Sequence, residues 1–515
     1  MQSSLAIPTN KRLVPFLAIL GILLGLWLAM LENGRINGDA DLYLEMASRF
    51  AQDDAQGALS LYQWPLLPWL MAQVHYLTGL DVESAGRLLG AIFFGIATWG
   101  FLELIREAGG SRNAILAGAL LLFSSPYIVG DVLPMIMRDQ GFWAFYLLAL
   151  LFFLRFYRSL SLADAMLWQL CVLVATLFRV EAVSFILLMP LLLPLRRDIS
   201  WRSRLQSLGM AYLVPLMGII LVILGGLLLP AAELQQKLGR LAEVQSSLQS
   251  VYHQISGGLA AKARIYGDQV LGKYMDNYAM LGLCLTLFSV IAGKIIGASG
   301  WLGIVLATTG KRCQAPAMDP DARTVLLWAA GINLLNLAVI LLTAYLLSAR
   351  YAVGMGFIVL VFAAFNLGGL CDRWLESGAR RSRWLALGLL LAALLMAYHL
   401  VRSLAPHDAD YNYEQAAVAW VKQHAAKDAR IYYDGARLRY YAHAPWGGRA
   451  DEWENNLPAL QATPARFDYL LLTVKGKNPN QLALLEQLAQ YRKVQEFRRD
   501  NSNAIVVMVS RELPD

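Results

Sequence analysis

Asp39 and Asp41 are the two carboxylates best placed to do chemistry in this sequence. They lie in the segment INGDADLYLEMASRF (36–50), which follows the first apolar run. A carboxylate near a membrane surface can take a proton from an attacking hydroxyl or amine, which makes that group nucleophilic. Gly38 and Asp39 also precede a helical pattern, where an aspartate commonly caps a helix. Asp39 is therefore either a general base or a helix cap.

Three more charged clusters adjoin apolar segments farther along the chain. They are Asp131 with Arg138 and Asp139, Arg179 with Glu181, and Arg350 followed by Tyr351. Arginine presents a planar fork of donors, so Arg138, Arg179 and Arg350 are suited to hold a lipid phosphate. Charges beside membrane spans are costly and by default indicate function. The structural alternative is that Arg179–Glu181 and Arg138–Asp139 are ion pairs inside a helix bundle.

The composition predicts an integral membrane protein. Of the 515 residues, 57% are hydrophobic and only 16% are charged, whereas soluble proteins carry about 25% charged residues. The net charge of +7 comes largely from basic loops between apolar runs, so it does not indicate nucleic-acid binding. The four cysteines form no CxxC pair, and no disulfide framework is expected.

Eleven apolar segments predict membrane-spanning helices, because most approach the roughly 20 residues that cross a bilayer. They cover residues 13–31, 85–105, 113–130, 141–157, 162–178, 183–195, 205–229, 278–306, 325–347, 352–370 and 384–404. Lys11 and Arg12 precede the first segment and place the N-terminus in the cytoplasm. The alternation then puts the basic loops at Arg155, Arg196 and Arg380 inside. It puts all four charged clusters on the outer face.

Two external stretches separate the predicted spans. Residues 32–82 contain helical patterns at 39–50 and 66–77, which are too short to span. Aromatic residues typical of a membrane interface accompany them, so we expect two helices along the outer surface; these residues are Tyr62, Trp64, Trp69 and Tyr76. The loop 230–277 contains an amphipathic pattern at 233–255, predicted as a surface helix or a lid.

Residues 405–515 are polar enough to form a small soluble domain after a transmembrane domain of residues 1–404. Residues 414–425 and 482–492 have helical patterns, and residues 429–435, 467–474 and 503–510 have strand patterns. The predicted fold class is thus an all-α polytopic membrane bundle of about 11 spans with a small C-terminal α/β domain.

Several segments together resemble a known family. The acidic residue after the first span is followed by WPLLPWL (64–70), LFRVEAVSFILLMPLLL (177–193) and SARYAVGMGFIVLV (348–361). In this order they resemble the GT-C glycosyltransferases of the protein O-mannosyltransferase and aminoarabinose transferase type, over roughly residues 13–400. The resemblance implies a polyprenyl-phosphate sugar donor and a site on the periplasmic face of a bacterial inner membrane.

The resemblance also implies roles for individual residues. The catalytic acidic residue of the family corresponds to Asp39, and a second acidic position corresponds to Asp139. The Arg-x-Glu segment of the family corresponds to Arg179 and Glu181. Its arginine–tyrosine pair near the donor phosphate corresponds to Arg350 and Tyr351. Arg138 and Asp41 are further substrate-binding candidates. Trp64-Pro65 stands where relatives often have two prolines, and Asp139 where many have glutamate.

The expected activity is transfer of one sugar, with inversion, from the lipid donor to an envelope glycan, lipid or protein. Some relatives use a divalent metal, but no dense histidine or carboxylate cluster occurs in this sequence, so we expect metal-independent transfer. The alternative is a transporter or flippase of lipid-linked sugars, for which internal repeats and charges at the membrane midplane are typical. A non-catalytic scaffold is a third hypothesis.

Overall fold

The computed structural model of the protein describes residues 12–32, 34–228, 257–272, 274–309, 318–376, 383–405, 412–447, 453–462, 465–475, 478–499 and 503–512. The chain divides into two compact units. The helical unit comprises Met1–Leu28, Tyr62–Leu67 and Ser84–Leu404. The mixed unit comprises Ala29–Leu61, Pro68–Glu83 and Ala405–Asp515. Residues 29–61 and 68–83 therefore group with the C-terminal residues.

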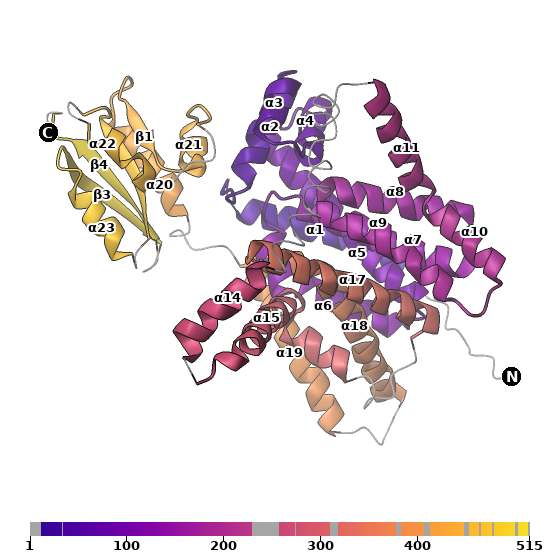
Figure 1. The fold of residues 1–515 in the computed structure, drawn as a ribbon. Helices are drawn as coiled ribbons and strands as arrows, with labels where there is room; N and C mark the ends of the chain where they lie inside the picture. The colour runs from indigo at the N-terminus through magenta and orange to yellow at the C-terminus, as the bar shows by residue number, and fades with distance from the viewer. Residues whose placement is uncertain are drawn as a thin grey trace. The chain divides into compact units, whose positions relative to one another are not determined.

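The helical unit is built from apolar helices (Figure 1). In chain order they are α1 (Leu13–Leu31), α5 (Val82–Glu107), α6 (Arg112–Phe123), η1 (Pro126–Val132), α7 (Asp139–Ser159), α8 (Leu162–Phe178), η2 (Val180–Ala182), α9 (Val183–Leu188), η3 (Met189–Leu195), α10 (Trp201–Ala211), α11 (Leu213–Leu228), α14 (Leu259–Tyr266), η5 (Gly267–Leu271), η6 (Asp276–Tyr278), α15 (Ala279–Thr308), α17 (Pro320–Ala344), η7 (Ala349–Ala352), α18 (Val353–Glu376) and α19 (Arg383–Leu404). Among the described residues, seven helices are long and apolar enough to cross a membrane, and the bent pair α6–η1 adds an eighth if it is one span. The protein is a multi-pass membrane protein.

Most of the predicted spans coincide with helices. Segments 162–178 and 183–195 are helical but shorter than usual spans, and segment 113–130 corresponds to the pair α6–η1, bent by 41°. The prediction of one continuous helix at 205–229 is wrong, because the chain is divided there into α10 and α11. Pro215 lies in the first turn of α11, where a residue without an N–H is tolerated. The predicted helix at 233–255 lies outside the described residues.

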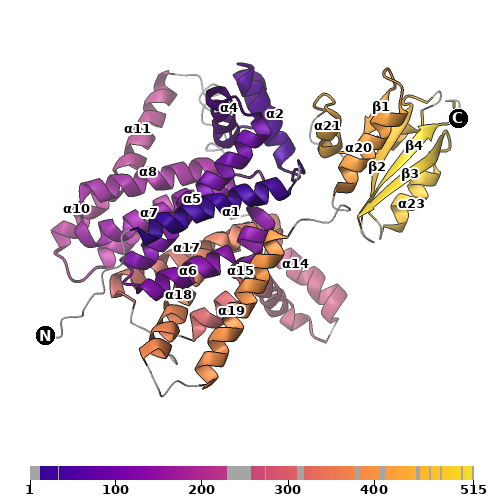
Figure 2. The ribbon, with the colours of Figure 1, turned by 180° about the vertical axis from the view of Figure 1, so that it is seen from behind.

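Helices α1 and α5 lie side by side (Figure 2) and approach each other through small residues. A Cβ built on Gly25 would lie 2.9 Å from the Cα of Ala91, and one built on Gly95 would lie 2.3 Å from the Cγ1 of Ile22. Helix association inside a membrane depends on close packing rather than on the hydrophobic effect. The glycines therefore fix this helix pair by removing the side chains that would hold the backbones apart.

Gly368 brings the backbone of α18 close to that of α6, since a Cβ there would lie 2.5 Å from both the backbone N and the Cα of Ala114. We expect Gly368→Ala to destabilise the protein by about 1–3 kcal/mol, because two rigid backbones must separate. The thermal midpoint of the detergent-solubilised protein measures this effect. Gly388→Ala in α19 is the matched control, because its Cβ would meet no described atom within 4 Å. Equal midpoints for the two variants would contradict this account.

Helix α7 separates two charged clusters. It has 21 residues and is therefore about 30 Å long, which matches the hydrocarbon thickness of a bilayer. At its C-terminal end, Arg158 Nη2 donates to Asp319 Oδ1 at 2.7 Å, and Arg155 Nη2 donates to Glu107 Oε1 at 2.8 Å. Asp139 begins the helix at the other end. The Asp139 end is thus a membrane thickness away from this ion-paired basic end.

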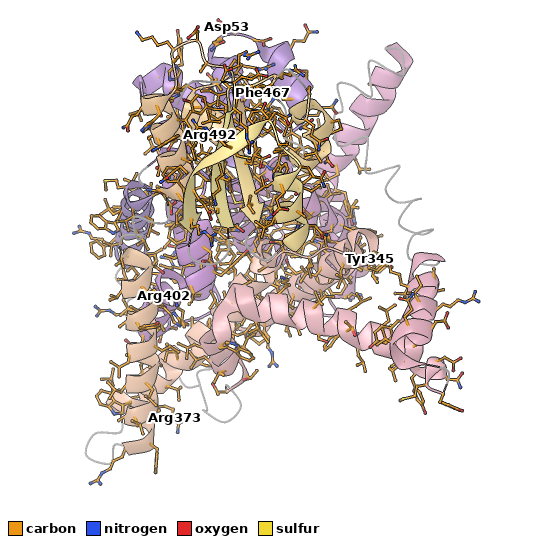
Figure 3. All side chains as sticks on the ribbon, turned by 90° about the vertical axis from the view of Figure 1, so that its left-hand side faces the viewer. Asp53, Tyr345, Arg373, Arg402, Phe467 and Arg492 are labelled. Carbon is orange, nitrogen blue, oxygen red and sulfur yellow. The ribbon has the colours of Figure 1, made fainter. Side chains whose placement is uncertain are left out.

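Helices α18 and α19 are antiparallel neighbours. Arg373 and Arg402 lie in the last turns of the two helices and appear at opposite ends of the pair in Figure 3. Neighbouring spans that reverse direction are what the predicted alternation of inside and outside loops requires.

The mixed unit begins with three short helices, α2 (Ala40–Ala51), α3 (Ala55–Leu61) and α4 (Leu66–Thr78). The helices predicted at 39–50 and 66–77 are confirmed as α2 and α4, and α3 is additional. Trp69 and Tyr76 are 46% and 85% exposed. Exposed aromatic residues of this kind are typical of a surface that meets a membrane interface.

The C-terminal residues form a four-stranded sheet with helices on both faces (Figure 1). Its elements are α20 (Tyr413–His424), β1 (Ile431–Tyr433), α21 (Ala436–Ala442), η10 (Trp453–Asn456), α22 (Leu457–Leu460), β2 (Tyr469–Lys475), α23 (Pro479–Glu486), β3 (Tyr491–Arg499) and β4 (Asn503–Ser510). The strand order is β1-β2-β4-β3, with β1 parallel to β2 and the other pairs antiparallel. The predicted α/β domain is confirmed.

Successive residues of β2 pack into different layers. Leu470 and Leu472 face a core that includes Leu484 of α23, whereas Leu471 faces a core that includes Val418 of α20. A strand covered on both faces is apolar at every position rather than at alternate ones. The predicted helix 482–492 is wrong at its end, because α23 stops at Glu486 and Tyr491 begins β3.

Candidate functional site

The core of the candidate site in the helical unit is an ion-pair triad of Asp139, Arg179 and Glu181, of which Asp139 and Arg179 are buried. Arg179 Nη1 donates to Asp139 Oδ1, and Arg179 Nη2 donates to Glu181 Oε1 at 3.1 Å. Asp139 and Arg179 are only 4% and 7% exposed. Buried charges persist only when they are paired and hydrogen-bonded, and here one cation serves two anions.

Aromatic rings surround the guanidinium of Arg179. Its Cζ lies 4.5 Å from the ring centroid of Tyr351 and 5.7 Å from that of Phe142. The Cζ of Arg350 lies 5.8 Å from the same Tyr351 ring. Cations within about 6 Å of an aromatic centroid are attracted by its quadrupole. Tyr351 therefore links two guanidinium groups that are far apart in the sequence.

Local chain geometry places these side chains together. Helix α8 ends at Phe178, and Arg179 leaves it in an extended conformation with φ −146° and ψ 123°. The short 3₁₀ turns η2 and η7 present Glu181 and Arg350. Asn336 of α17 donates to the carbonyl of Glu181 at 3.2 Å and to Ser184 Oγ at 2.8 Å. Helices α7, α8 and α17 and the turns η2 and η7 thus all contribute to the cluster.

Two aromatic residues in the segment before α4 also contact this region. Trp64 Nε1 donates to the carbonyl of Phe178 at 3.1 Å, and Trp64 is 5% exposed. The Cζ of Arg138 lies 5.4 Å from the ring centroid of Tyr62. Trp64 thus packs against the end of α8 and is buried, unlike Trp69 and Tyr76. The tryptophan directly before a proline was the sequence signal that could have marked it as structural.

Asp39 and Asp41 belong to the mixed unit. Asp39 occupies the N-cap position of α2, but among the described residues its side chain makes no capping hydrogen bond. Asp41 is 6% exposed, and its Oδ1 accepts a hydrogen bond from the backbone N of Leu42 at 2.7 Å. Asp39 therefore occupies the predicted cap position without a side-chain capping hydrogen bond among the described residues, and the base alternative stays a prediction.

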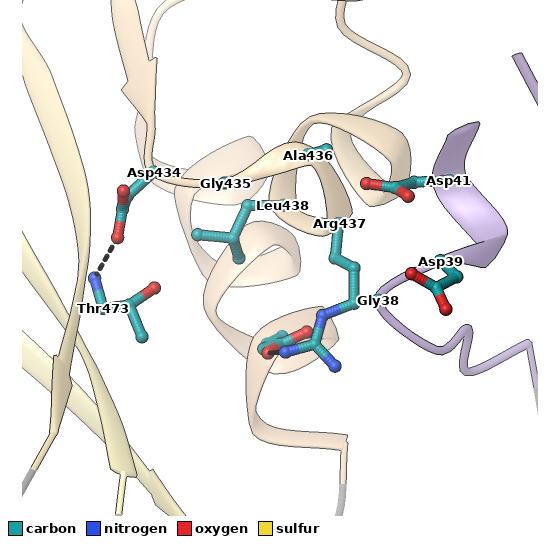
Figure 4. A pocket seen from close by; sticks show the side chains of 10 residues that line it. Gly38, Asp39, Asp41, Asp434, Gly435, Ala436, Arg437, Leu438 and Thr473 are labelled. Atoms are coloured by element: carbon teal, nitrogen blue, oxygen red, sulfur yellow. Dashed lines mark hydrogen bonds and ion pairs between the residues drawn. The ribbon is translucent and has the colours of Figure 1, made fainter. Parts of the chain in front are cut away.

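Both carboxylates line a cavity of about 360 Å³ within the mixed unit (Figure 4). The other side comes from α20 and the turn between β1 and α21, and includes Glu414, Asp434 and Arg437. Arg437 Nη2 donates to Glu414 Oε1. Gly435, with φ +84°, allows the sharp turn from β1 into α21. A pocket at the carboxyl end of parallel strands is a common ligand position.

Hydrogen bonds tie α21 to Ile36 and to Glu83. The hydroxyl of Tyr441 accepts from the backbone N of Ile36 at 2.9 Å, and Tyr440 donates to Glu83 Oε2 at 2.7 Å. Burial raises the pKa of Tyr441 to about 12, so its hydroxyl stays protonated at neutral pH. These two hydrogen bonds hold α21 in place, and α21 lines the cavity beside Asp39.

Asp434 makes this cavity sensitive to pH. Burial raises its pKa above the usual range, although the hydrogen bond from the backbone N of Thr473 at 3.0 Å opposes the shift. The unfolded chain has a pKa of about 3.9, so stability should fall as the pH rises above about 4 through the folded-state value. We expect Asp434→Asn to remove this loss. Hydrogen exchange at the backbone N–H of Leu471, corrected for intrinsic exchange rates, measures this pH dependence of stability. Identical pH profiles for the wild type and Asp434→Asn would contradict the prediction.

Six of the eight predicted site residues are thus found in the helical unit, and contacts link five of them. Arg179 contacts Asp139, Glu181 and Tyr351, and Tyr351 also contacts Arg350. The ion-pair alternative holds for Arg179–Glu181, and the partner found for Asp139 is Arg179. Sequence reasoning missed Phe142 and the roles of Tyr62 and Trp64.

The described residues contain no group of three or more His, Cys, Asp or Glu side chains that could hold a metal.

Part of the chain matches a known protein family. Residues 63–224 match the family described as dolichyl-phosphate-mannose-protein mannosyltransferase. The matched region contains Asp139, Arg179 and Glu181, and it confirms the predicted resemblance to membrane glycosyltransferases of the GT-C type. No curated protein matches the chain.

One solved structure that the chain resembles is the mycobacterial arabinofuranosyltransferase AftD, determined by single-particle electron cryo-microscopy. The sequences are 15% identical, and the TM-score is 0.46. The alignment covers 97% of this chain and 40% of that chain, so this protein spans less than half the length of AftD.

Proposed function

We propose that this membrane glycosyltransferase moves one sugar from a polyprenyl-phosphate donor to an acceptor on the periplasmic side of a bacterial inner membrane. The N-terminus would then lie in the cytoplasm and the C-terminal domain in the periplasm. The family match supports the reaction class. The separation of basic and mixed-charge clusters by the length of α7 supports a site at one membrane face.

The observation that carries the proposal is the charge arrangement around Arg179. The predicted site residues of the helical unit include three arginines, Arg138, Arg179 and Arg350, and two carboxylates, Asp139 and Glu181, which gives a formal net charge of +1. Arg179 is already shared between the two carboxylates. We assign the donor phosphate to Arg350 and Arg138, whose guanidinium groups suit phosphate oxygens.

The proposed reaction is a single displacement at the anomeric carbon. The acceptor hydroxyl or amine gives its proton to the carboxylate of Asp39 as its oxygen or nitrogen bonds to the anomeric carbon. The bond from that carbon to the phosphate oxygen breaks, and polyprenyl phosphate leaves with the electron pair. Attack from the opposite face inverts the configuration. Arg350 and Arg138 would stabilise the negative charge that develops on the phosphate.

The remaining predicted residues would position the substrates. Asp139 uses Oδ1 to bind Arg179, and we assign its second oxygen to a sugar hydroxyl. Glu181 and Tyr351 would hold Arg179 and Arg350 in place through the contacts described above. Asp41, which lines the same cavity as Asp39, would bind the acceptor.

Purified protein in proteoliposomes, supplied with radiolabelled polyprenyl-phosphate sugars and envelope extract, tests this function. We expect label to move to an acceptor, at the same rate with and without EDTA. Loss of transfer on EDTA treatment, restored by a divalent cation, would contradict metal independence. Movement of intact donor across the bilayer without transfer would contradict the enzyme and favour a flippase.

A further inference from the structure

A second cavity, of about 500 Å³, lies within the C-terminal domain and shares no lining residue with the cavity at Asp39. We call it the basic pocket. Its walls come from β1, α21, the segment after α21, and the residues that precede β2. The residues that give it chemical character are Tyr432, Arg439, Asn456, Arg466 and Phe467. Its volume is in the range of small-molecule sites.

Arg439 is the most informative side chain in the basic pocket. Its Nη1 is buried and has no hydrogen-bond partner among the described residues. A Cβ built on Gly447 would lie 1.9 Å from that nitrogen, so the missing side chain at Gly447 makes room for the guanidinium. Buried polar groups in folded proteins nearly always have a partner, and an orphaned donor points to a ligand that accepts from it.

The other side chains add a second cation and two aromatic rings. Arg466 is exposed, and its Cζ lies 5.5 Å from the ring centroid of Phe467. Phe467 and Tyr432 pack edge to face at 5.4 Å, and Asn456 Nδ2 donates to the Tyr432 hydroxyl at 3.2 Å. None of the described residues that line the pocket is acidic. Among the described residues, the pocket lining therefore offers two guanidinium groups and no carboxylate.

We propose that the basic pocket binds an acidic saccharide unit of the acceptor, meaning a sugar ring that carries a carboxylate or a phosphate. Arg439 and Arg466 would bind the anionic group through paired charge-assisted hydrogen bonds. Tyr432 and Phe467 would supply apolar surface for the ring, and the amide of Asn456 would contact a hydroxyl. This inference rests on the proposed function, for which it names the acceptor class.

Binding of two matched disaccharides to the full-length protein in detergent tests the proposal. Cellobiouronic acid and cellobiose share two rings and differ by one carboxylate, and calorimetry or ligand-observed NMR measures their affinities. We expect the acid to bind at least about tenfold more tightly than cellobiose. Equal binding of the two disaccharides, or binding of neither, would overturn the assignment. Inorganic phosphate binding as tightly as the acid would overturn the role of the sugar ring.

Three arginine variants locate the binding. We expect Arg439→Gln and Arg466→Gln each to weaken binding of the acid about tenfold or more. Arg511→Gln removes the same charge from an exposed position of the domain that does not line the pocket, and it should bind normally. Arg466 is exposed, so its variant tests the pocket even if Arg439→Gln does not fold. Equal affinity of Arg466→Gln and Arg511→Gln would overturn the proposal.

The binding assay also separates this inference from the proposed function. Asp39→Asn should bind cellobiouronic acid like the wild type, because Asp39 does not line the basic pocket. Wild-type protein that transfers sugar but does not bind the acid would overturn the inference and leave the function standing. Wild-type protein that binds the acid but transfers no sugar would overturn the function and the acceptor role of the pocket.

Discussion

Asp39→Asn is expected to lower the turnover rate of sugar transfer by about 100- to 10,000-fold, the range that a positioned general base contributes. The amide keeps the size of the side chain but cannot accept the proton of the acceptor at neutral pH. Donor affinity should change little, because the phosphate is assigned to arginines of the helical unit. Steady-state kinetics with labelled donor, together with a direct donor-binding measurement, separates the two effects.

Asp53→Asn is the control for this variant. Asp53 is an exposed residue that follows α2 and is labelled in Figure 3. Its φ of 60° lies in the left-handed region, which asparagine tolerates well. It should therefore fold and transfer sugar normally. If Asp39→Asn turns over as fast as Asp53→Asn, Asp39 is not the base. If it binds donor poorly but turns over normally at saturation, Asp39 is a binding residue.

The membrane helices could be predicted well where an apolar run has sharp polar ends. The predicted bounds 13–31 and 162–178 are those of α1 and α8. The break between α10 and α11 could not be read from hydropathy, because the residues on both sides of Tyr212 are apolar enough to continue a span. Pro215 was the local signal, since proline favours the first turn of a helix over its interior.

Strand β3 could not be predicted from the sequence for a different reason. Its sequence, YRKVQEFRR (491–499), is dominated by charged and polar residues and lacks a run of apolar ones. It lies at the edge of the sheet beside β4, where charged side chains protect an open edge from pairing with other chains. An edge strand of this kind becomes recognisable only when its partner is known. The predicted helix 482–492 therefore runs into the start of β3 at Tyr491.

The site could be predicted in its residue types but not in its pairing. Topology alone placed Asp139 and Arg179 on one face, yet the two lie 40 positions apart, and the sequence suggested the neighbouring pair Arg138–Asp139. The actual pairing depends on how α7 and α8 pack and on the extended backbone at Arg179. Similarly, the contact of Trp64 with the end of α8 could not follow from local pattern.

Arg179→Gln should be the most damaging change in the helical unit. It would leave the carboxylates of Asp139 and Glu181 close together without their shared cation. Removing one partner of a buried ion pair costs about 3–5 kcal/mol, because the remaining charge is desolvated and uncompensated. We expect a large fall in the thermal midpoint of the detergent-solubilised protein. Arg179→Lys should lower the thermal midpoint less, because it keeps the positive charge. It should still lose the paired contact that the guanidinium makes with Asp139 and Glu181.

The matched control lies at the other end of α7. Arg158 also contacts two carboxylates, Glu107 and Asp319, but its side chain is 27% exposed. Exposed ion pairs contribute about 0–1 kcal/mol, so Arg158→Gln should lower the midpoint only slightly. Equal midpoints for Arg158→Gln and Arg179→Gln would show that burial does not set the importance of Arg179.

A double variant then separates stability from function. Asp139→Asn combined with Arg179→Gln removes one negative charge together with the positive one, so it should recover part of the midpoint lost in Arg179→Gln. Sugar transfer should stay low, because the double variant loses the carboxylate assigned to the sugar. Recovery of both stability and transfer would mean that the triad only holds the helices together. Recovery of stability alone would mean that Asp139, Arg179 or both act in the reaction beyond holding the helices together.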